Sequence, residues 1–225
     1  MLDIFDKYDV LGAFWMTIKL TFFSAIGALV IGTLLAVMRV SPIDVLRRVG
    51  AFYVNTVRNT PLTLLMFFSI AGPYYILQLS LTDKGSSTAI VDNGIRWAMV
   101  ALAVYHAAFV CEALRSGMNT VPLGQAEAAR SIGLTFGQSL REVILPQAFR
   151  GSIAPLGSVL IALTKNTTVA SVIGVAEASG LMKTIIENET ASFAVFFVFA
   201  LGFVILTLPV GVLFTSMSRR LAVKR

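Results

Sequence analysis

Charged residues are scarce in this chain: Asp, Glu, Lys and Arg make up 13% of its 225 residues, while hydrophobic residues make up 56%. The mean hydropathy is +0.82. A soluble globular domain usually carries about twice that share of charge. The scarcity therefore excludes a soluble protein and indicates an integral membrane protein.

Cysteine and histidine each occur only once, as Cys111 and His106. A single cysteine excludes an internal disulfide and a cysteine-based metal cluster, and a single histidine excludes a multi-histidine metal site. We expect Cys111 to be a small buried hydrophobe. We expect His106 to pack between helices with one hydrogen-bonded nitrogen.

Several enzyme motifs are also missing. The sequence holds no G-x-x-x-x-G-K-[ST] phosphate loop, no G-x-S-x-G nucleophile elbow and no H-E-x-x-H zinc motif. We therefore expect the chain to be non-catalytic. Its start, MLDIFDKYD, is acidic where a cleaved signal peptide is basic, so we expect the first span to be retained.

Five apolar stretches are long enough to cross a hydrocarbon core of about 30 Å, which takes roughly 20 helical residues. They cover residues 12–38, 61–81, 95–114, 152–176 and 191–217. We predict an all-α integral membrane fold with five transmembrane helices. It forms a single transmembrane domain over residues 1–225, with a cytoplasmic coupling-helix loop at about 120–148 between the third and fourth spans.

Positive charges divide unevenly between the two sides of this arrangement. Segments 39–58, 112–150 and 219–225 share one face and hold twelve Lys and Arg, against four on the other face. Because Lys and Arg are retained in the cytoplasm during insertion, we place the N-terminus outside and the C-terminus inside. The same bias accounts for the net charge of +6, so no nucleic-acid partner is expected.

The stretch between the third and fourth predicted spans is the least membrane-like part of the chain, and it predicts two short helices joined by an elbow. Pro122 suits the first position of a helix, and Gly133 supplies the left-handed residue that ends it. Thr135 and Gln138 have the spacing of a capping box. The second helix, which they start, is predicted to stop before Pro146.

Small side chains line this elbow, so that a partner surface can approach its backbone. They are Ala126, Ala128 and Ala129, while Glu127 and Arg130 offer charges that fix the register of a partner. The elbow is therefore expected to be a small protrusion that docks into a cleft on another protein. An amphipathic loop lying on the lipid headgroups is the alternative.

A pattern in this stretch resembles the E-A-A-x3-G-x9-I-x-L-P loop of the permease subunits of ABC importers. It consists of Glu127-Ala128-Ala129, three residues, Gly133, nine residues, and Val143-Ile144-Leu145-Pro146, with Val143 in place of the first Ile. Other motifs resemble polar amino acid importers of the histidine and glutamine type. They are Arg58-Asn59-Thr60-Pro61-Leu62, Val121-Pro122-x-Gly124-Gln125, Leu145-Pro146-Gln147-Ala148 and Lys165-Asn166-Thr167-Thr168. The similarity extends from Thr17 to about Ser218.

The resemblance implies half of a type I importer, with five transmembrane helices, in a bacterial inner membrane. Its partners would be a cytoplasmic ATPase dimer, a second permease that is identical or paralogous, and an extracytoplasmic solute-binding protein. The ATPase would bind ATP and Mg, and this chain would bind no cofactor or metal. The solute would be a polar amino acid, with a slight preference for glutamate or glutamine.

The same resemblance implies a docking surface for the ATPase. The coupling residues would be Gln125, Glu127, Ala128, Ala129, Gly133, Leu145 and Pro146. Closure of the ATPase dimer on ATP would draw two such surfaces together. Rigid helices would then turn the pathway from inward facing to outward facing.

Polar residues inside a span are the default candidates for the solute pathway, because placing them against lipid is costly. They are Lys165, Asn166, Thr167 and Thr168 in the fourth span. Lys165 suits a solute carboxylate, but we favour a structural pairing with Glu112 or a helix C-terminus. The two threonines either line the pathway or bond only their own preceding turn. Glu112 and Arg115, one helical turn apart, are expected to form a local ion pair.

Two further features have packing explanations. Thr60 as N-cap and Pro61 as first residue start the second span, which puts Arg58 at the inner headgroups. In the first span, a stripe of small residues allows close helix contact. The stripe consists of Gly27, Ala28, Gly32 and Ala36.

Two other functions compete with an importer subunit. One is a secondary amino acid transporter or channel independent of ATP, which usually shows inverted repeats and several ionisable residues at mid-membrane. The other is a membrane scaffold without a transport role. Neighbouring genes for a Walker A ATPase and a secreted solute-binding protein would favour the importer.

Overall fold

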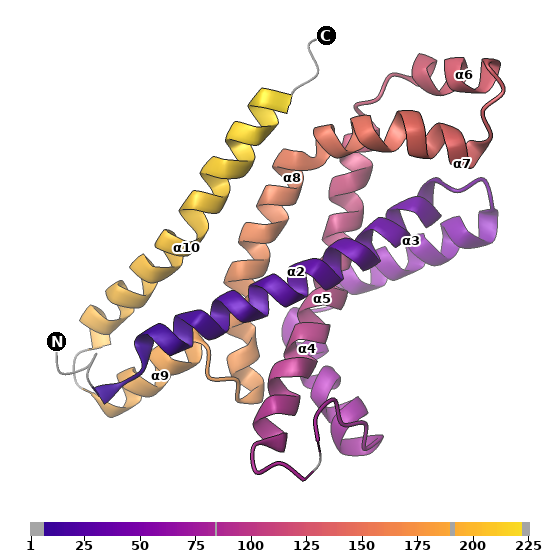
Figure 1. The fold of residues 1–225 in the computed structure, drawn as a ribbon. Coiled ribbons are helices and arrows are strands. Elements are labelled where there is room, and N and C mark those ends of the chain that lie inside the picture. The colour runs from indigo at the N-terminus through magenta and orange to yellow at the C-terminus, as the bar shows by residue number, and fades with distance from the viewer. Residues whose placement is uncertain (1–6, 84, 190–191, 222–225) are drawn as a thin grey trace.

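The computed structural model describes residues 7–83, 85–189 and 192–221, and every regular element in those ranges is helical (Figure 1). The α-helices are α2 (Val10–Val40), α3 (Asp44–Asn59), α4 (Leu62–Ile70), α5 (Ala89–Met118), α6 (Leu123–Ser131), α7 (Phe136–Gln138), α8 (Leu145–Asn166), α9 (Ala178–Asn188) and α10 (Ser192–Leu221). Two π-helical turns, η1 (Ala71–Ile76) and η2 (Ser139–Ile144), and a 3-10 turn, η3 (Thr167–Ile173), continue them. The predicted all-α fold is confirmed.

Four helical stretches in the described part of the chain are long and apolar enough to cross a membrane. They are Val10–Val40, Ala89–Met118, Phe136–Ile173 and Phe193–Leu221. The predicted second span, 61–81, is helical only over Leu62–Ile76, which is shorter. The helix ends there because Gln78 adopts a left-handed φ of 55°, which an α-helix does not contain. A fifth crossing stays a prediction.

Helix α3 is an element that the apolar pattern did not reveal, because it is amphipathic and begins with several charges. Asp44 pairs with Arg48 one turn later at 2.6 Å. Farther along the helix, Val54 is fully buried in a cluster with residues of α2 and α5. The Tyr53 hydroxyl donates a 2.8 Å hydrogen bond to the Val104 carbonyl. Helix α3 therefore folds back along α2 and is fastened to α5 (Figure 1).

The stripe of small residues on α2 forms a close helix contact as predicted, and its partner is α5. A Cβ atom added at Gly32 would lie 2.6 Å from the Val110 Cβ, and one at Gly27 would lie 2.9 Å from the Ala103 Cβ. Ala28 and Ala36 are each 1% exposed. Without these small side chains the two helices could not approach so closely.

Helix α10 stands at the side of the bundle and contacts mainly α8 and α9 (Figure 1). Its ring Phe199 stacks on Phe14 of α2 with 5.5 Å between centroids. Gly157 of α8 leaves room for Phe214, since a Cβ there would lie 2.5 Å from the Phe214 Cβ. Many other apolar side chains of α10 are exposed in the single chain, as expected of a helix that faces lipid or another subunit.

The ends of the helices fall into two groups. Figure 1 shows α6, α7, the turn between α2 and α3 and the C-terminal end of α10 toward the upper part of the molecule. Helix α9 and the connection between η1 and α5 lie toward the lower part. The described parts of the three basic segments that the sequence assigns to one face therefore gather toward the same end.

Candidate coupling segment and solute pathway

The elbow between α6 and α7 has the geometry that the sequence predicts. Gly133 follows the last turn of α6 with a left-handed φ of 86°. Its N–H donates to the Arg130 carbonyl at 3.0 Å, and the Leu134 N–H donates to the Ala129 carbonyl at 3.1 Å. These two bonds form a Schellman motif, which satisfies carbonyls that the helix end leaves unpaired.

The second arm of the elbow starts with the predicted capping box. The Thr135 N–H donates to the Gln138 side-chain oxygen at 2.9 Å, and the Gln138 N–H donates to the Thr135 hydroxyl at 3.4 Å. Pro122, however, is the N-cap of α6 and not its first helical residue, which is Leu123. Proline has no N–H to donate, so either position is compatible with its chemistry.

The prediction that the second helix stops before Pro146 is wrong. The helix continues from α7 through the π-helical turn η2 into α8, where Pro146 is the second residue. In a π turn each N–H reaches a carbonyl five residues back, so the bonding pattern changes at the start of α8. Because Pro146 lies at this change of pattern, its missing N–H does not remove a regular α-helical hydrogen bond. The coupling segment and the fourth span therefore form one continuous, bent rod.

Most of the predicted coupling residues are on the surface. Gln125, Glu127, Ala128, Gly133 and Pro146 are exposed, Leu145 is half-buried, and Ala129 is the buried residue of α6. Two apolar neighbours stand out beside them, since Leu123 is 83% and Ile132 is 78% exposed. Within the described chain, neither Glu127 nor Arg130 forms an ion pair. The elbow thus presents unpaired charge and uncovered apolar surface together.

The predicted pairing of Lys165 with Glu112 is not found among the described residues, and the role of this lysine stays a prediction. Glu112 is instead surrounded by arginines: Arg39 contacts it directly, Arg115 lies at 3.3 Å and Arg58 at 4.0 Å. The predicted ion pair with Arg115 is therefore confirmed. The side chain of Lys165 is exposed and has no partner among the described residues. Its ammonium group is free to meet a group from outside the chain.

The neighbours of Lys165 are held by internal hydrogen bonds. The Thr167 hydroxyl donates to the Thr164 carbonyl and the Thr168 hydroxyl to the Lys165 carbonyl, each at 2.8 Å. Both threonines thus bond their own preceding turn. Thr167 is fully buried, so it does not line a pathway in this conformation.

His106 connects α5 to the polar end of α8. Its Nδ1 lies 2.9 Å from the Leu102 carbonyl, and its Nε2 lies 3.1 Å from the Asn166 amide nitrogen. Because a carbonyl only accepts, Nδ1 carries the proton and Nε2 accepts from Asn166. Both ring nitrogens therefore form hydrogen bonds, whereas a hydrogen bond to only one of them was predicted from the sequence. The ring is 1% exposed, so it fixes the position of the residue next to Lys165.

Glu177 is a buried carboxylate that the sequence interpretation missed. It caps the N-terminus of α9, where it accepts hydrogen bonds from the Ser179 N–H at 2.9 Å and the Gly180 N–H at 2.8 Å. Burial raises the pKa of this carboxyl above its ordinary value of 4.5, and these N–H groups and the Thr17 hydroxyl partly oppose the rise. The available signal was an acidic residue directly before a helical stretch, since a carboxylate near a helix N-terminus is stabilised by the helix dipole.

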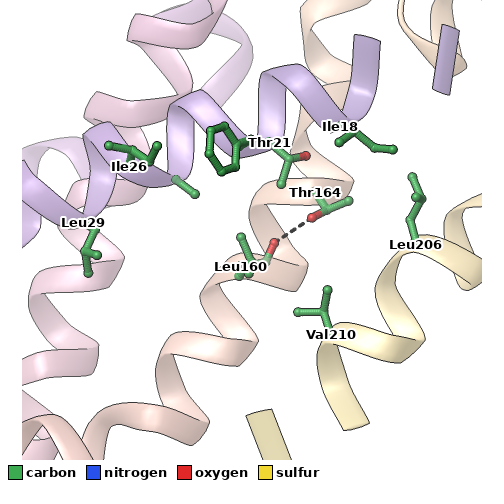
Figure 2. A pocket seen from close by; sticks show the side chains of 10 residues that line it. Ile18, Thr21, Ile26, Leu29, Leu160, Thr164, Leu206 and Val210 are labelled. Carbon is green, nitrogen blue, oxygen red and sulfur yellow. Dashed lines mark hydrogen bonds between the residues drawn. The ribbon is translucent and has the colours of Figure 1, made fainter. Parts of the chain in front are cut away.

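An apolar cavity of about 500 Å³ opens between α2, α8 and α10 (Figure 2). Its hydroxyl groups belong to Thr21 and Thr164, and both donate to their own helix, to the Thr17 and Leu160 carbonyls at 2.9 Å. Figure 2 shows aliphatic side chains such as Ile26, Leu206 and Val210 around the rest of the space. Within the described chain this space offers a zwitterionic solute no free polar partner, so we do not assign the solute to it.

Comparison with known proteins identifies the family. The description "binding-protein-dependent transport system inner membrane component" matches residues 28–223 of the chain. The chain belongs to this family. One relative, the glutamate transport system permease protein GluC of Corynebacterium glutamicum, is 58% identical over 218 residues, which cover 96% of both chains. Another, the probable glutamine ABC transporter permease protein GlnM of Bacillus subtilis, is 31% identical over 97% of this chain and 96% of its own.

Solved structures show the same architecture. The structure of an amino acid ABC transporter with histidines matches with a TM-score of 0.82 and 27% identity, and covers 97% of both chains. An inward-facing MetNI methionine ABC transporter matches with a TM-score of 0.78 and covers 95% of this chain and 96% of its own. At 24% identity the second match shows the fold alone.

Membership of this family makes the chain a multi-pass plasma-membrane protein and the permease subunit of an ABC importer. It favours this function over a secondary transporter or channel. Permease subunits are not catalytic, and a partner ATPase hydrolyses ATP. A second permease subunit forms the other half of the pathway.

Proposed function

We propose that this chain imports an acidic amino acid, with glutamate as the solute. The observation that carries the proposal is the 58% identity with the glutamate permease GluC over 96% of both chains. The free ammonium group of Lys165 in the fourth span supports it, because an intramembrane cation suits a solute with an extra carboxylate. Asn166, which is hydrogen-bonded to His106, follows Lys165 in the chain, and we assign it to the same wall of the pathway. Thr167 and Thr168 form the next helical turn and hold these two residues in place.

The elbow is the docking surface of the cytoplasmic ATPase. Gln125, Glu127, Ala128 and Gly133 form the exposed contact surface, while the buried Ala129 packs α6 against the rest of the chain. Leu145 and Pro146 join this surface to the rod of α8. The unpaired carboxylate of Glu127 favours a protein partner over a position on the headgroups, where lipid phosphates would repel it. Movement of the elbow is then transmitted along the continuous helix from Phe136 to Lys165.

The permease crosses the membrane five times as one domain over residues 1–225, with the N-terminus outside and the C-terminus in the cytoplasm. The second crossing is the stretch 61–81, in which α4 and η1 are helical over Leu62–Ile76, and it follows a break at Thr60, which has an extended ψ of 130°. The basic ends that gather in Figure 1 support this orientation. An extracytoplasmic solute-binding protein delivers the solute on the opposite face. ATP and Mg bind to the ATPase, and this chain holds no cofactor.

Copurification and uptake test the proposal together. The tagged chain is purified from membranes of its native host, and an ATPase, a second permease and a solute-binding protein are expected with it. When the complex is reconstituted into vesicles, labelled glutamate should cross the membrane and accumulate only if ATP is present on the side of the membrane that carries the ATPase. Uptake driven by an ion gradient without ATP would contradict the proposal, as would competition by glutamine or arginine as strong as that by unlabelled glutamate.

A further inference from the structure

Three arginines from three helices surround a single carboxylate. Arg39 is the second-last residue of α2, Arg58 lies at the end of α3, and Arg115 is one turn beyond Glu112 on α5. All three guanidinium groups lie within 4.0 Å of the Glu112 carboxylate. We call these four residues the arginine cluster. Three positive charges and one negative charge leave a surplus of two positive charges.

No other carboxylate in the described chain compensates this surplus. The acid Asp44 on neighbouring α3 is already shared by Arg47 and Arg48. The cluster is also half-enclosed, since the side chain of Arg39 is 15% exposed and that of Glu112 is 31% exposed. Surplus charge in such a setting is poorly screened by water and draws in an anion.

We propose that the arginine cluster binds the phosphate of an anionic lipid headgroup. In the orientation proposed above, the ends of α2 and α5 lie at the inner leaflet, where headgroup phosphates are the most concentrated anions. Guanidinium groups match phosphate oxygens with paired hydrogen bonds, which a single ammonium group cannot do.

Arg58 is the member best placed to change partner. Its guanidinium carbon lies 5.7 Å from the centre of the Phe109 ring, which keeps the cation at the cluster. Its 4.0 Å separation from Glu112 is too long for a hydrogen bond, and its side chain is 44% exposed. Arg58 thus has donors available for a phosphate while Arg39 and Arg115 remain bound to Glu112.

A lipid titration of the purified complex in mild detergent tests the proposal. Phosphatidylglycerol should raise the thermal midpoint, and phosphatidylcholine with the same acyl chains should raise it much less. Arg58→Gln should weaken the apparent affinity for phosphatidylglycerol roughly fivefold, as expected for the loss of one arginine near a lipid phosphate. Arg58→Lys, which keeps the charge, should retain most of it. The matched control is Arg48→Gln, which removes the same charge from the same helix at a residue that pairs with Asp44 and not with Glu112, and it should bind as the native chain does.

Several results would overturn the proposal. They are an equal effect of the two lipids, an unchanged affinity of Arg58→Gln, and reproduction of the whole shift by inorganic phosphate or by glutamate without lipid. Should Arg58→Gln fail to assemble, Glu112→Gln provides the second test. It increases the surplus charge, so phosphatidylglycerol binding must be retained or strengthened, and its loss would refute the site. The titration does not measure transport, so its failure leaves the importer assignment intact.

Discussion

At the scale of single residues, Lys165 is distinguished by what surrounds it. The next residue is fixed by His106, and the two after that bond their own turn, whereas the lysine ammonium has no internal partner. A charge left free inside a span needs a functional reason. Lys165→Met is expected to weaken glutamate uptake roughly tenfold or more in apparent affinity, the size of a lost hydrogen bond between charged groups. Concentration-dependent uptake into reconstituted vesicles measures it.

Two variants control this experiment. Lys165→Arg keeps the charge and should retain most of the uptake. Lys183→Met removes a 74% exposed lysine from α9, next to Glu187, and should leave uptake unchanged. Uptake by Lys165→Met at the native apparent affinity would mean that the lysine does not contact the solute.

Glu177 gives a prediction about pH. Because burial raises its pKa in the folded chain, the protonated form favours folding. This contribution is fully present below the unfolded value of about 4.5 and is lost as the pH rises through the raised folded value. Relative to Glu177→Gln, the native complex should therefore lose thermal stability as the pH rises from about 4.5, and the difference should then level off. Thermal midpoints of both proteins from pH 4 to 8 provide the measurement, and a native midpoint that rises relative to that of Glu177→Gln as the pH rises would refute the prediction.

At the scale of elements, the sequence predicted what local chemistry decides. Gly133 and the Thr135–Gln138 box were identified because a left-handed residue and a cap depend on a few neighbouring residues. Helix α3 was missed because its charges hide an apolar face that only α2 and α5 make visible. The continuation through Pro146 was missed because the π turn that allows it has no clear sequence signal.

Gly133→Asp tests the elbow as a coupling element. A side chain there meets open space within the chain, and the left-handed φ costs about 1 kcal/mol, so folding and insertion should persist. The added carboxylate should block docking, and both solute uptake and solute-stimulated ATPase activity should fall at least tenfold. Side-by-side assays of uptake and ATP hydrolysis on the purified complex measure this.

The companion variant Gly133→Asn separates charge from shape. Asn tolerates the left-handed conformation and carries no charge. If shape excludes the ATPase, Asn should uncouple nearly as strongly as Asp, whereas recovery with Asn would assign the effect to charge. Normal transport by an assembled Gly133→Asp complex would remove the elbow from the docking surface.

At the scale of the whole molecule, the arrangement of helices decides which charges meet. Glu112 was expected near Arg115, three residues away, but Arg39 and Arg58 come from distant parts of the chain. The sequence gives no distance between such residues until α2, α3 and α5 are placed side by side. The same limit explains why Glu112, together with a helix C-terminus, was named as a partner for Lys165, since both residues interrupt apolar spans but lie on different helices.

The proposed orientation leads to a labelling experiment with two cysteines. Cys111 is buried, so Cys111→Ala provides a background without a reactive thiol. In that background, Gly137→Cys places a thiol on the exposed arm of the elbow, and Ser87→Cys places one in the exposed connection before α5. An impermeant maleimide should label position 87 in intact cells and position 137 only after the cells are opened. The chain should also be labelled without its ATPase, because docking could shield position 137. Labelling of position 137 from outside would show that the true orientation is the reverse of the proposed one. The elbow and the basic helix ends would then meet their partners on the other side of the membrane.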